Sequence, residues 1–358
     1  MKEKNIKIIK PWNGDFMYKE DGYEKDNALF IPVTVQAPSG SELFLNGRPM
    51  KAENGVYEGE AVLTGYESKI VLTDKDNRVL DEIRLYWAKN TDMKYRFSLD
   101  DNIWWLRDLA KNASVYKSLF DNPFLAFFKK LHDAFGTKVH FNIYYQDEAD
   151  FNLSMMPEKY KGEFIANSDW IALTFHALAN DPDKPYENTT YEKIYTHCQM
   201  VTDEIKRFAG EEVLSDYTTI HWGAVNREGC KALKDFGFKG LVGYFEMVDG
   251  KPLVSYYFDE YYTKHINQRD IYRDTEFGLT FIKNDMVVNT FKREDIIPSL
   301  EKTLSNPHTS RFIELMIHEQ YYHPHYIQYQ PDYEQKIWDA VKLVAERGYK
   351  PAFLKEIL

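Results

Sequence analysis

Hydrophobic positions follow two different patterns along this chain, and the pattern changes near residue 90. Up to that point short apolar runs alternate with turn signals, without helical periodicity. Asn46-Gly47 and Asn54-Gly55 are typical hairpin dipeptides, because both residues accept positive φ. The runs are Leu29-Phe30-Ile31, Leu43-Phe44-Leu45, Val56-Tyr57, Ala61-Val62-Leu63, Ile70-Val71-Leu72 and Ile83-Arg84-Leu85. Short strands at this spacing predict a small all-β sandwich over residues 1–90.

From residue 91 to 358 the pattern alternates between strands and helices. A helix is predicted from Asn122-Pro123 to Gly136, and a last helix from Asp332 to Gly348. Residues 247–290 look like an insertion. The predicted strands cover residues 95–99, 139–144, 170–175, 218–220, 241–245 and 312–317. Repeated strand–helix units with right-handed crossovers predict a parallel sheet, here a closed or nearly closed (β/α) barrel in an α/β chain.

Composition narrows the class of protein. The length of 358 residues suits a barrel plus a small module. The net charge of −11 argues against binding to nucleic acid or to anionic membranes. Residues 1–5 lead into polar sequence without an apolar signal region, and no run is long enough to cross a bilayer. We therefore expect a cytoplasmic protein, and the oligomeric state stays open.

Two adjacent carboxylates end the first strand of the barrel-like part. Phe97 and Leu99 alternate with smaller or polar residues, and Asp100 and Asp101 follow directly. Neighbouring carboxylates repel each other unless a cation, a shared proton or water relieves the charge. The alternative is a turn that caps the following helix, since Asp and Asn are good N-cap residues.

Further polar residues fall where other predicted strands end. In parallel barrels these positions share one rim. The residues are Asp100, Asp101, His176, His221, Glu246 and His318. Converging imidazole and carboxylate groups suit a divalent metal such as zinc.

At these residues the chain resembles the polysaccharide deacetylase family of carbohydrate esterases, over about residues 93 to 358. The stretch Phe97-Ser98-Leu99-Asp100-Asp101-Asn102 resembles the family's Thr-Phe-Asp-Asp-Gly-like strand end. The resemblance implies that Asp100 is the catalytic base and Asp101 a metal ligand. Met316-Ile317-His318 resembles the family's last motif, which implies that His318 is the general acid.

The two middle motifs of the family are only partly present. In the second motif a metal-binding His is followed four residues later by another, and here His176 is followed by Asn180. In the third, His221-Trp222-Gly223 takes the strand end and Gly237-Phe238 follows the helix, while the family's Arg is absent. We expect His221 to supply the missing nitrogen, so that Asp101, His176 and His221 hold the metal.

These features predict a metal-dependent hydrolase that deacetylates a carbohydrate or a related amide or ester. Asp100 would take the proton of the attacking water, and His318 would protonate the leaving group. Glu246 or Glu319 is expected to hold the His318 imidazole, and both are predicted on the substrate side of the site. The aromatic residues Trp104, Trp222 and Tyr244 could stack on sugar faces.

Two other functions remain open at this point. One is a catalytically degenerate carbohydrate-binding or scaffold protein, which bound metal would distinguish from an enzyme. The other is a glycoside hydrolase that pairs Asp100 with Glu246 or Glu319, which the carboxylate separation would test. Residues 1–90 loosely resemble the immunoglobulin-like modules attached to carbohydrate-active enzymes, so a structural or interdomain role is expected there.

Overall fold

The computed structural model describes residues 5–53 and 56–358, so the predicted Asn54-Gly55 turn lies outside the described residues. The chain divides into two compact units. One contains the residues up to Asp92 together with Ile271–Gly278, and the other contains Met93–Asp270 and Leu279–Leu358. The segment Ile271–Gly278, which includes β18 (Ile271–Asp274), therefore clusters with the N-terminal unit although it lies within the predicted second domain.

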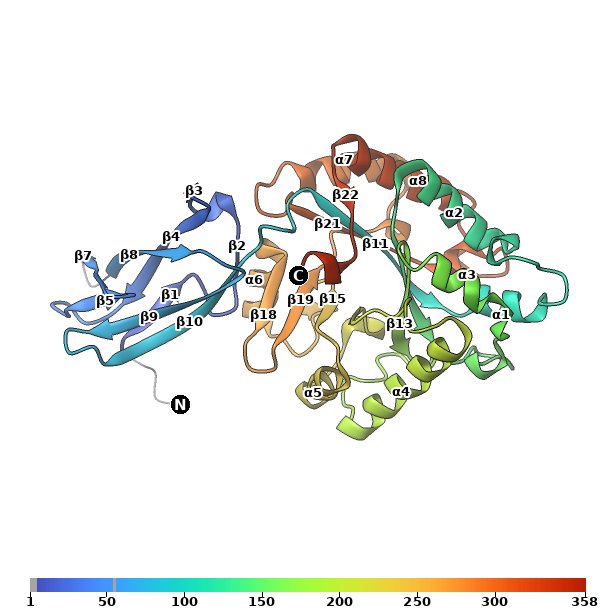
Figure 1. The fold of residues 1–358 in the computed structure, drawn as a ribbon, viewed down its shortest axis with the longest axis horizontal. Coiled ribbons are helices and arrows are strands. Elements are labelled where there is room, and N and C mark those ends of the chain that lie inside the picture. Colours follow the sequence, from blue (N-terminus) through green and yellow to red (C-terminus); the bar gives the residue numbers. More distant parts are fainter. Residues whose placement is uncertain (1–4, 54–55) are drawn as a thin grey trace. The chain divides into compact units, whose positions relative to one another are not determined.

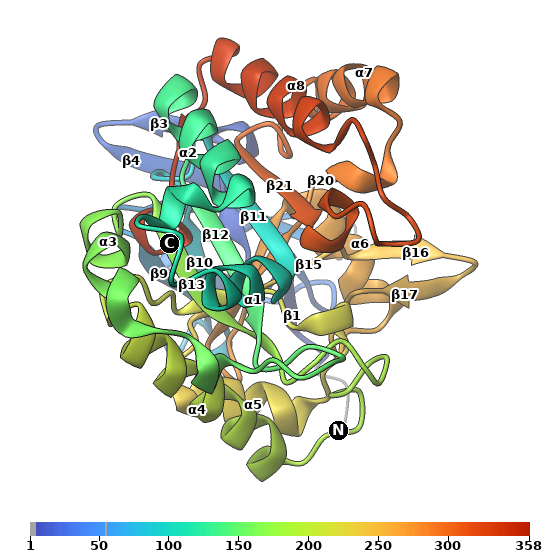
Figure 2. The same cartoon turned by 90° about the vertical axis from the view of Figure 1, so that its right-hand side faces the viewer.

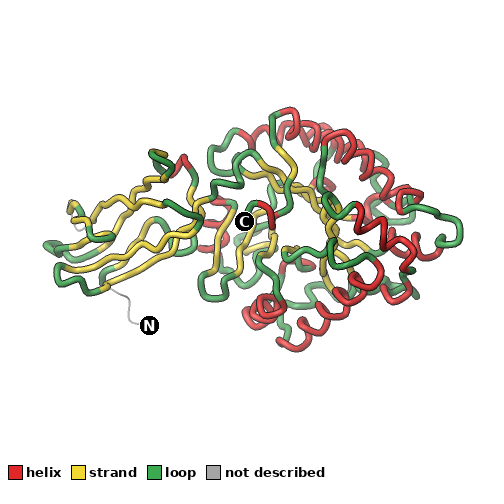
Figure 3. Tube along the Cα trace, viewed as in Figure 1, coloured by secondary structure: helices red, strands yellow, loops and turns green. Residues whose placement is uncertain are grey.

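The N-terminal unit consists almost entirely of strands and loops (Figure 3). One sheet has the order β1-β4-β8-β7, with β3 paired to β4, and the other has the order β2-β10-β9-β5-β6. The strands of the first sheet are β1 (Lys7–Lys10), β3 (Tyr23–Lys25), β4 (Ala28–Gln36), β7 (Lys51–Glu53) and β8 (Val56–Leu63). Those of the second are β2 (Phe16–Met17), β5 (Leu43–Leu45), β6 (Arg48–Pro49), β9 (Glu67–Asp74) and β10 (Val79–Trp87).

Both of these sheets bury their apolar side chains in one core. Val33 and Val35 of β4 belong to the same buried cluster as Leu72 of β9 and Leu85 of β10. The predicted hairpin turn at Asn46-Gly47 joins β5 to β6 with positive φ at both residues. Strands and hairpin turns thus alternate in the described part of this unit.

Parallel strands form the interior of the second unit. One sheet has the order β13-β12-β11-β21-β20, with β22 also paired to β11, and β14, β15 and β19 pair in parallel in another. The first sheet contains β11 (Lys94–Asn102), β12 (Val139–Tyr144), β13 (Ile171–Ala177), β20 (Met286–Val287), β21 (Phe312–His318) and β22 (Lys350–Pro351). The second contains β14 (Tyr217–Thr218), β15 (Gly240–Gly243) and β19 (Leu279–Lys283).

The described parallel strands of this unit form two ladders rather than one continuous ring. Between β13 and β14 the connection is an isolated bridge from Leu173 to Leu214. On the other side, the Asn284 amide donates to the Gly243 carbonyl at 2.7 Å just before β20 begins. The α/β class is confirmed, and closure of the barrel remains a proposal.

Helices cover the outer side of these strands (Figures 1 and 2). The predicted helix after Asn122 is α2, which the Asn122 side chain caps and which Gly136 ends at a φ of 69°. The helices of this unit are α1 (Trp104–Lys111), α2 (Pro123–Phe135), α3 (Lys161–Ala166), α4 (Tyr191–Phe208), α5 (Arg227–Phe236), α6 (Glu260–Arg269), α7 (Arg293–Leu304) and α8 (Tyr333–Glu346). Among the described residues, no helix combines the length and the apolar character needed to cross a membrane.

The prediction of an insertion over residues 247–290 was wrong in its second half. A hairpin of β16 (Glu246–Val248) and β17 (Lys251–Leu253) turns at Asp249-Gly250, and α6 follows. However, β19 pairs in parallel with β15 and is buried along its whole length. The run Leu279-Thr280-Phe281-Ile282 carries the signal of a buried strand, and it is too short to stand out beside the aromatic segment before it.

Candidate metal centre

Asp100 and Asp101 reach the same edge of the sheet because β11 bulges at its end. In a regular strand consecutive side chains point to opposite faces. The pairing of β11 with β12 shifts between Leu99 and Asn102, and Asp101 has a φ of 64°. A bulge of this kind re-aims one side chain. Both carboxylates consequently line the same cavity.

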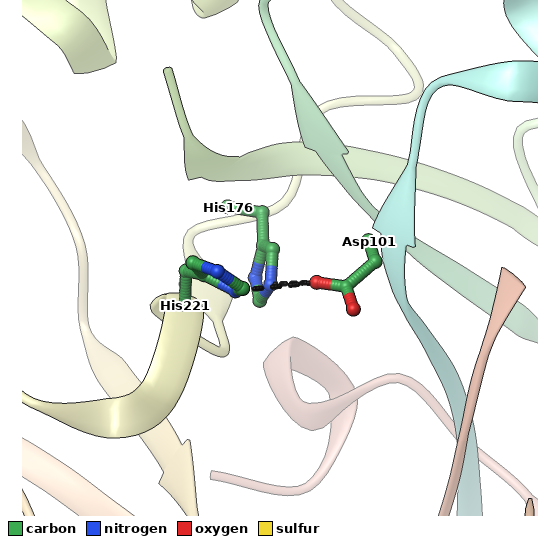
Figure 4. A group of neighbouring side chains, drawn as sticks. All are labelled: Asp101, His176 and His221. Atoms are coloured by element: carbon green, nitrogen blue, oxygen red, sulfur yellow. Dashed lines mark hydrogen bonds and ion pairs between the residues drawn. The ribbon is translucent and has the colours of Figure 1, made fainter. Parts of the chain in front are cut away.

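Asp101, His176 and His221 form a buried cluster at the ends of β11 and β13 and the start of the turn η5 (His221–Gly223) (Figure 4). Nε2 of His176 lies 3.0 Å from Asp101 Oδ1, and Nδ1 of His221 lies 3.2 Å from the same oxygen. The structure therefore brings together the three residues that the sequence predicted as metal ligands.

The outer nitrogen of His176 is held by a backbone carbonyl. Nδ1 of His176 lies in hydrogen-bond contact with the carbonyl oxygen of Thr219. Because a carbonyl only accepts, Nδ1 must carry a proton and donate it. In the neutral ring the lone pair is then on Nε2, which faces Asp101. Histidines that bind metals are usually oriented in this way by a second hydrogen bond.

His221 is oriented by the same device. Its Nε2 lies 3.0 Å from the backbone carbonyl oxygen of Asn180, so Nε2–H donates and the lone pair of the neutral ring is on Nδ1. Asn180 stands where the family resemblance would have a second metal-binding histidine. Its backbone, not its side chain, contributes to the centre by fixing the ring of His221.

The close contacts in this centre shift the pKa values of Asp101 and His176. Burial alone would raise the pKa of Asp101, but hydrogen bonds from His176 and His221 outweigh it and hold this pKa well below its usual range. Burial would lower the pKa of His176, but the charges of Asp100 and Asp101 raise it above the ordinary value. The charged form of the Asp101 carboxylate is thus favoured, and a metal ion bound beside it would compete with protons for His176.

Two residues that the sequence analysis did not single out also contact Asp101. The hydroxyl of Tyr144, at the end of β12, bonds to Asp101 Oδ1, and Nε2 of Gln320 donates to Asp101 Oδ2 at 2.7 Å. Burial raises the pKa of the Tyr144 phenol, and the Asp101 charge raises it further. The strand-end rule that selected the histidines applies to Tyr144 as well, whereas Gln320 carried no signal.

A cavity of about 480 Å³ adjoins the centre. It is lined by, among others, Asp100, Asp101, His176, His221, Trp222, Tyr244, Asn284, His318 and Gln320. Asp100 Oδ1 accepts a hydrogen bond from the Asn142 side chain at 2.5 Å. Nδ1 of His318 donates to Asn289 Oδ1 at 2.9 Å, which leaves Nε2 of His318 for a ligand. Asp100 and His318, the predicted base and acid, thus lie on one cavity wall.

Glu319 was one of the two residues expected to hold the His318 imidazole. Its carboxylate instead caps the N-terminus of helix α1. It accepts hydrogen bonds from the backbone N–H groups of Ile103, Trp104 and Trp105 at 2.7, 3.0 and 2.6 Å. Nε2 of His323 adds a fourth contact at 3.0 Å. The first N–H groups of a helix lack partners within the helix, and a buried carboxylate satisfies them. The carboxylate of Glu319 therefore stabilises the start of α1 and is not available to bind substrate.

The other predicted substrate residues lie in different places. Glu246 is on the β16–β17 hairpin, bonded to the Asn267 side chain at 3.1 Å, and it is not among the residues that line the cavity. Trp222 and Tyr244 do line it, and Trp222 is 41% exposed. Trp104 lies on a smaller neighbouring cavity of about 240 Å³, which also reaches Asp101. Of the residues predicted to contact substrate, Trp222 and Tyr244 therefore line the main cavity, whereas Glu246 and Glu319 do not.

No protein-family model matches the chain, and no curated protein sequence does. Solved structures with a similar course of the chain include carbohydrate esterases of the CE4 family. A CE4 esterase from Streptococcus mutans has 9% identity, covers 74% of this chain and 87% of its own, and gives a TM-score of 0.40. A putative polysaccharide deacetylase from Mycobacterium smegmatis has 11% identity, coverages of 73% and 93%, and a TM-score of 0.39.

A third structural neighbour is a CE4 family pseudoenzyme from Bacillus anthracis. It has 12% identity, covers 74% of this chain and 65% of its own, and gives a TM-score of 0.34. At this level of similarity the chemistry of the chain has to come from its own side chains.

Proposed function

We propose that this protein is a metal-dependent hydrolase that removes an acyl group from a carbohydrate. One observation carries the proposal: both histidines beside Asp101 donate their outer N–H to backbone carbonyls. In a neutral ring the inner nitrogen is then unprotonated. The two inner nitrogens face the same carboxylate oxygen of Asp101 at 3.0 and 3.2 Å, so acceptor faces acceptor in both pairs. A divalent cation satisfies all three groups at once.

The donor set fits zinc or a similar ion. Two imidazole nitrogens and one carboxylate oxygen are the protein ligands of one common class of catalytic zinc site. Asp101, His176 and His221 would hold the ion, and Gln320 would keep the second oxygen of Asp101 occupied. When bound, such an ion lowers the pKa of a coordinated water and polarises the acyl carbonyl.

Asp100 and His318 supply the proton transfers in this proposal. Asp100 lies next to the ligand Asp101, and the Asn142 amide fixes the orientation of its carboxylate as a proton acceptor. His318 has its Nδ1–H fixed on Asn289, so that Nε2 can deliver a proton to the leaving amine or alkoxide. Each of these residues is held by a neutral side chain that cannot itself take the proton.

The walls of the cavity favour an uncharged sugar. Trp222 and Tyr244 provide aromatic faces. None of the described residues that line the cavity is Lys or Arg, while Asp100, Asp101 and Asp183 are all acidic. A substrate rich in carboxylate or phosphate groups would meet repulsion there. An acetylated neutral sugar is the substrate class that this lining suits best.

Two structural details belong to the same proposal. The second unit would be a closed or nearly closed deacetylase-type barrel, in which the two parallel ladders complete one ring. The N-terminal unit would be an immunoglobulin-like module with a structural role, because residues 1–90 loosely resemble the modules of this kind that are attached to carbohydrate-active enzymes.

Metal analysis of matched histidine variants tests the centre. Purified protein is incubated with zinc, desalted and examined by elemental analysis. We expect wild-type protein and His318→Ala to retain stoichiometric zinc and His221→Ala to lose it, because His221, unlike His318, faces Asp101 with a ring nitrogen. Release of acetate from acetylated oligosaccharides should be lost in both variants.

Other results would contradict the proposal in different ways. Retention of zinc in His221→Ala together with its loss in His318→Ala would mean that the ligand set is wrong. Wild-type protein that takes up no divalent metal at all would overturn the hydrolase and leave a carbohydrate-binding or scaffold role on the same fold.

A further inference from the structure

The hydroxyl of Tyr144 lies among the ligand atoms of the candidate centre rather than behind them. It contacts Asp101 Oδ1, the oxygen that also faces both histidines, and it lies 2.9 Å from Nδ1 of His221. Tyr144 is 1% exposed, so water does not compete for this oxygen. A residue that merely supports a metal ligand would be expected on the far oxygen of Asp101, where Gln320 is.

The hydrogen bonds at this hydroxyl cannot all be satisfied by the proton it carries. Asp101 Oδ1 and the inward Nδ1 of a neutral His221 are both acceptors, because Nε2–H of His221 is used on the Asn180 carbonyl. A phenol has a single O–H and can donate to only one of them. A cation bound between the oxygen of Tyr144, the oxygen of Asp101 and the nitrogen of His221 removes this conflict.

We propose that Tyr144 is a fourth protein ligand of the metal, through its phenolate oxygen. This inference rests on the metal centre of the proposed function and adds a ligand that the family resemblance did not imply. On binding, the O–H bond of Tyr144 breaks, its proton passes to water, and the oxygen lone pair forms the bond to the metal. Coordinated water then takes a fifth position, a coordination number that catalytic zinc sites reach.

The spacing of the atoms agrees with a shared ligand sphere. Ligands about 2.0–2.1 Å from one zinc ion lie roughly 3 Å from one another. The separations found here are 3.0 Å between His176 and Asp101, 3.2 Å between His221 and Asp101, and 2.9 Å between Tyr144 and His221. The Tyr144 hydroxyl and Asp101 Oδ1 lie closer together, in hydrogen-bond contact, and outward movement of these side chains would open the cluster to this size.

Substitution of copper for zinc provides a spectroscopic test for a tyrosine ligand. We expect wild-type protein loaded with Cu²⁺ to show a phenolate-to-copper charge-transfer band in visible absorption, with phenolate vibrations in resonance Raman spectra excited in that band. Tyr144→Phe removes only the hydroxyl, so it should abolish the band. Zinc binding measured by calorimetry should weaken by at least the roughly 10- to 100-fold that loss of an outer-shell partner costs. Neither readout depends on hydrolysis.

Tyr186→Phe is the matched control. Tyr186 is also fully buried, and its hydroxyl also contacts a histidine, Nδ1 of His197 at 2.9 Å. Unlike Tyr144, which lines the smaller cavity that reaches Asp101, Tyr186 lines neither of the two cavities beside the centre. This variant should keep the band and the zinc affinity of the wild type. If Tyr144→Phe does not fold, the resonance Raman spectrum of the copper-loaded wild type tests the proposal alone, through the presence or absence of phenolate vibrations.

The outcomes separate this inference from the proposed function. Copper binding by the wild type without a phenolate band, or a band that persists in Tyr144→Phe, would overturn Tyr144 as a ligand and leave the centre of Asp101, His176 and His221 intact. An absence of binding for both copper and zinc would overturn the metal centre itself.

Discussion

Replacing Asp100 by Asn is expected to reduce deacetylation by about 100- to 10,000-fold while leaving metal content and fold nearly unchanged. The substitution keeps the volume of the side chain and removes the proposed proton acceptor beside Asp101, the proposed metal ligand. General base catalysis is worth about this factor, roughly 3 to 5 kcal/mol of activation free energy. The measurement is the initial rate of acetate release, together with zinc content and the thermal unfolding midpoint of each variant.

Asp183→Asn is the matched control for this experiment. Asp183 also lines the main cavity but does not belong to the Asp101, His176 and His221 cluster. Its substitution should change the rate far less than that of Asp100. Asp101→Ala should cost at least as much activity as Asp100→Asn and should also lose the metal. Full activity in Asp100→Asn would show that Asp100 only shapes the strand end, and the base would have to be sought elsewhere on the cavity wall.

Replacing Arg96 by Met is expected to destabilise the protein by about 3 to 5 kcal/mol at pH 8, because it removes one partner of a buried ion pair. Arg96 and Glu314 lie on the adjacent strands β11 and β21, and neither side chain is exposed. The Arg96 guanidinium bonds to Glu314 Oε1 and also donates through Nε to Nδ1 of His140 at 3.1 Å. Ser98 donates to the same Glu314 oxygen at 3.1 Å. Urea unfolding of the two proteins measures the difference.

The loss of stability in Arg96→Met should be smaller at pH 5 than at pH 8. Burial raises the pKa of Glu314 from 4.5 to about 7, although Arg96 acts to lower it. Between these values the folded protein holds a proton that the unfolded chain has released, so this group's contribution to stability is complete at low pH and is lost as the pH rises through 7. At pH 5 Glu314 is neutral in the native state of both proteins, and no unpaired carboxylate is left buried.

Arg293→Met provides the control for stability. Arg293 pairs with Asp339 at 2.7 Å, but 48% of its side chain is exposed. An exposed pair contributes about 0 to 1 kcal/mol, so this variant should unfold close to the wild type at both pH values. Equal losses for the two arginine variants, or a loss in Arg96→Met that does not change with pH, would contradict the role assigned to the buried pair.

Local sequence signals determined where some of the elements begin and end. Asn122-Pro123 and Gly136 delimit α2 because an N-cap side chain, a first-turn proline and a left-handed glycine act within a few residues. The same locality applies to Asn46-Gly47, whose conformation makes a hairpin in any sheet. Placing His176 and His318 at strand ends needed only the strand pattern and the geometry of parallel sheets.

The tertiary structure alone decided what these residues do. Glu319 follows His318 directly in the sequence. Its carboxylate nevertheless accepts hydrogen bonds from the backbone N–H groups at the start of α1, about 215 residues away in the chain. The Asn180 carbonyl fixes His221, and the bulge in β11 turns Asp101 toward both histidines. Hydrogen-bond partners between distant segments depend on strand register and backbone carbonyl positions, which no residue type encodes. The strand ends could therefore be predicted, but the tautomers of the two histidines and the place of Tyr144 among the ligand atoms could not.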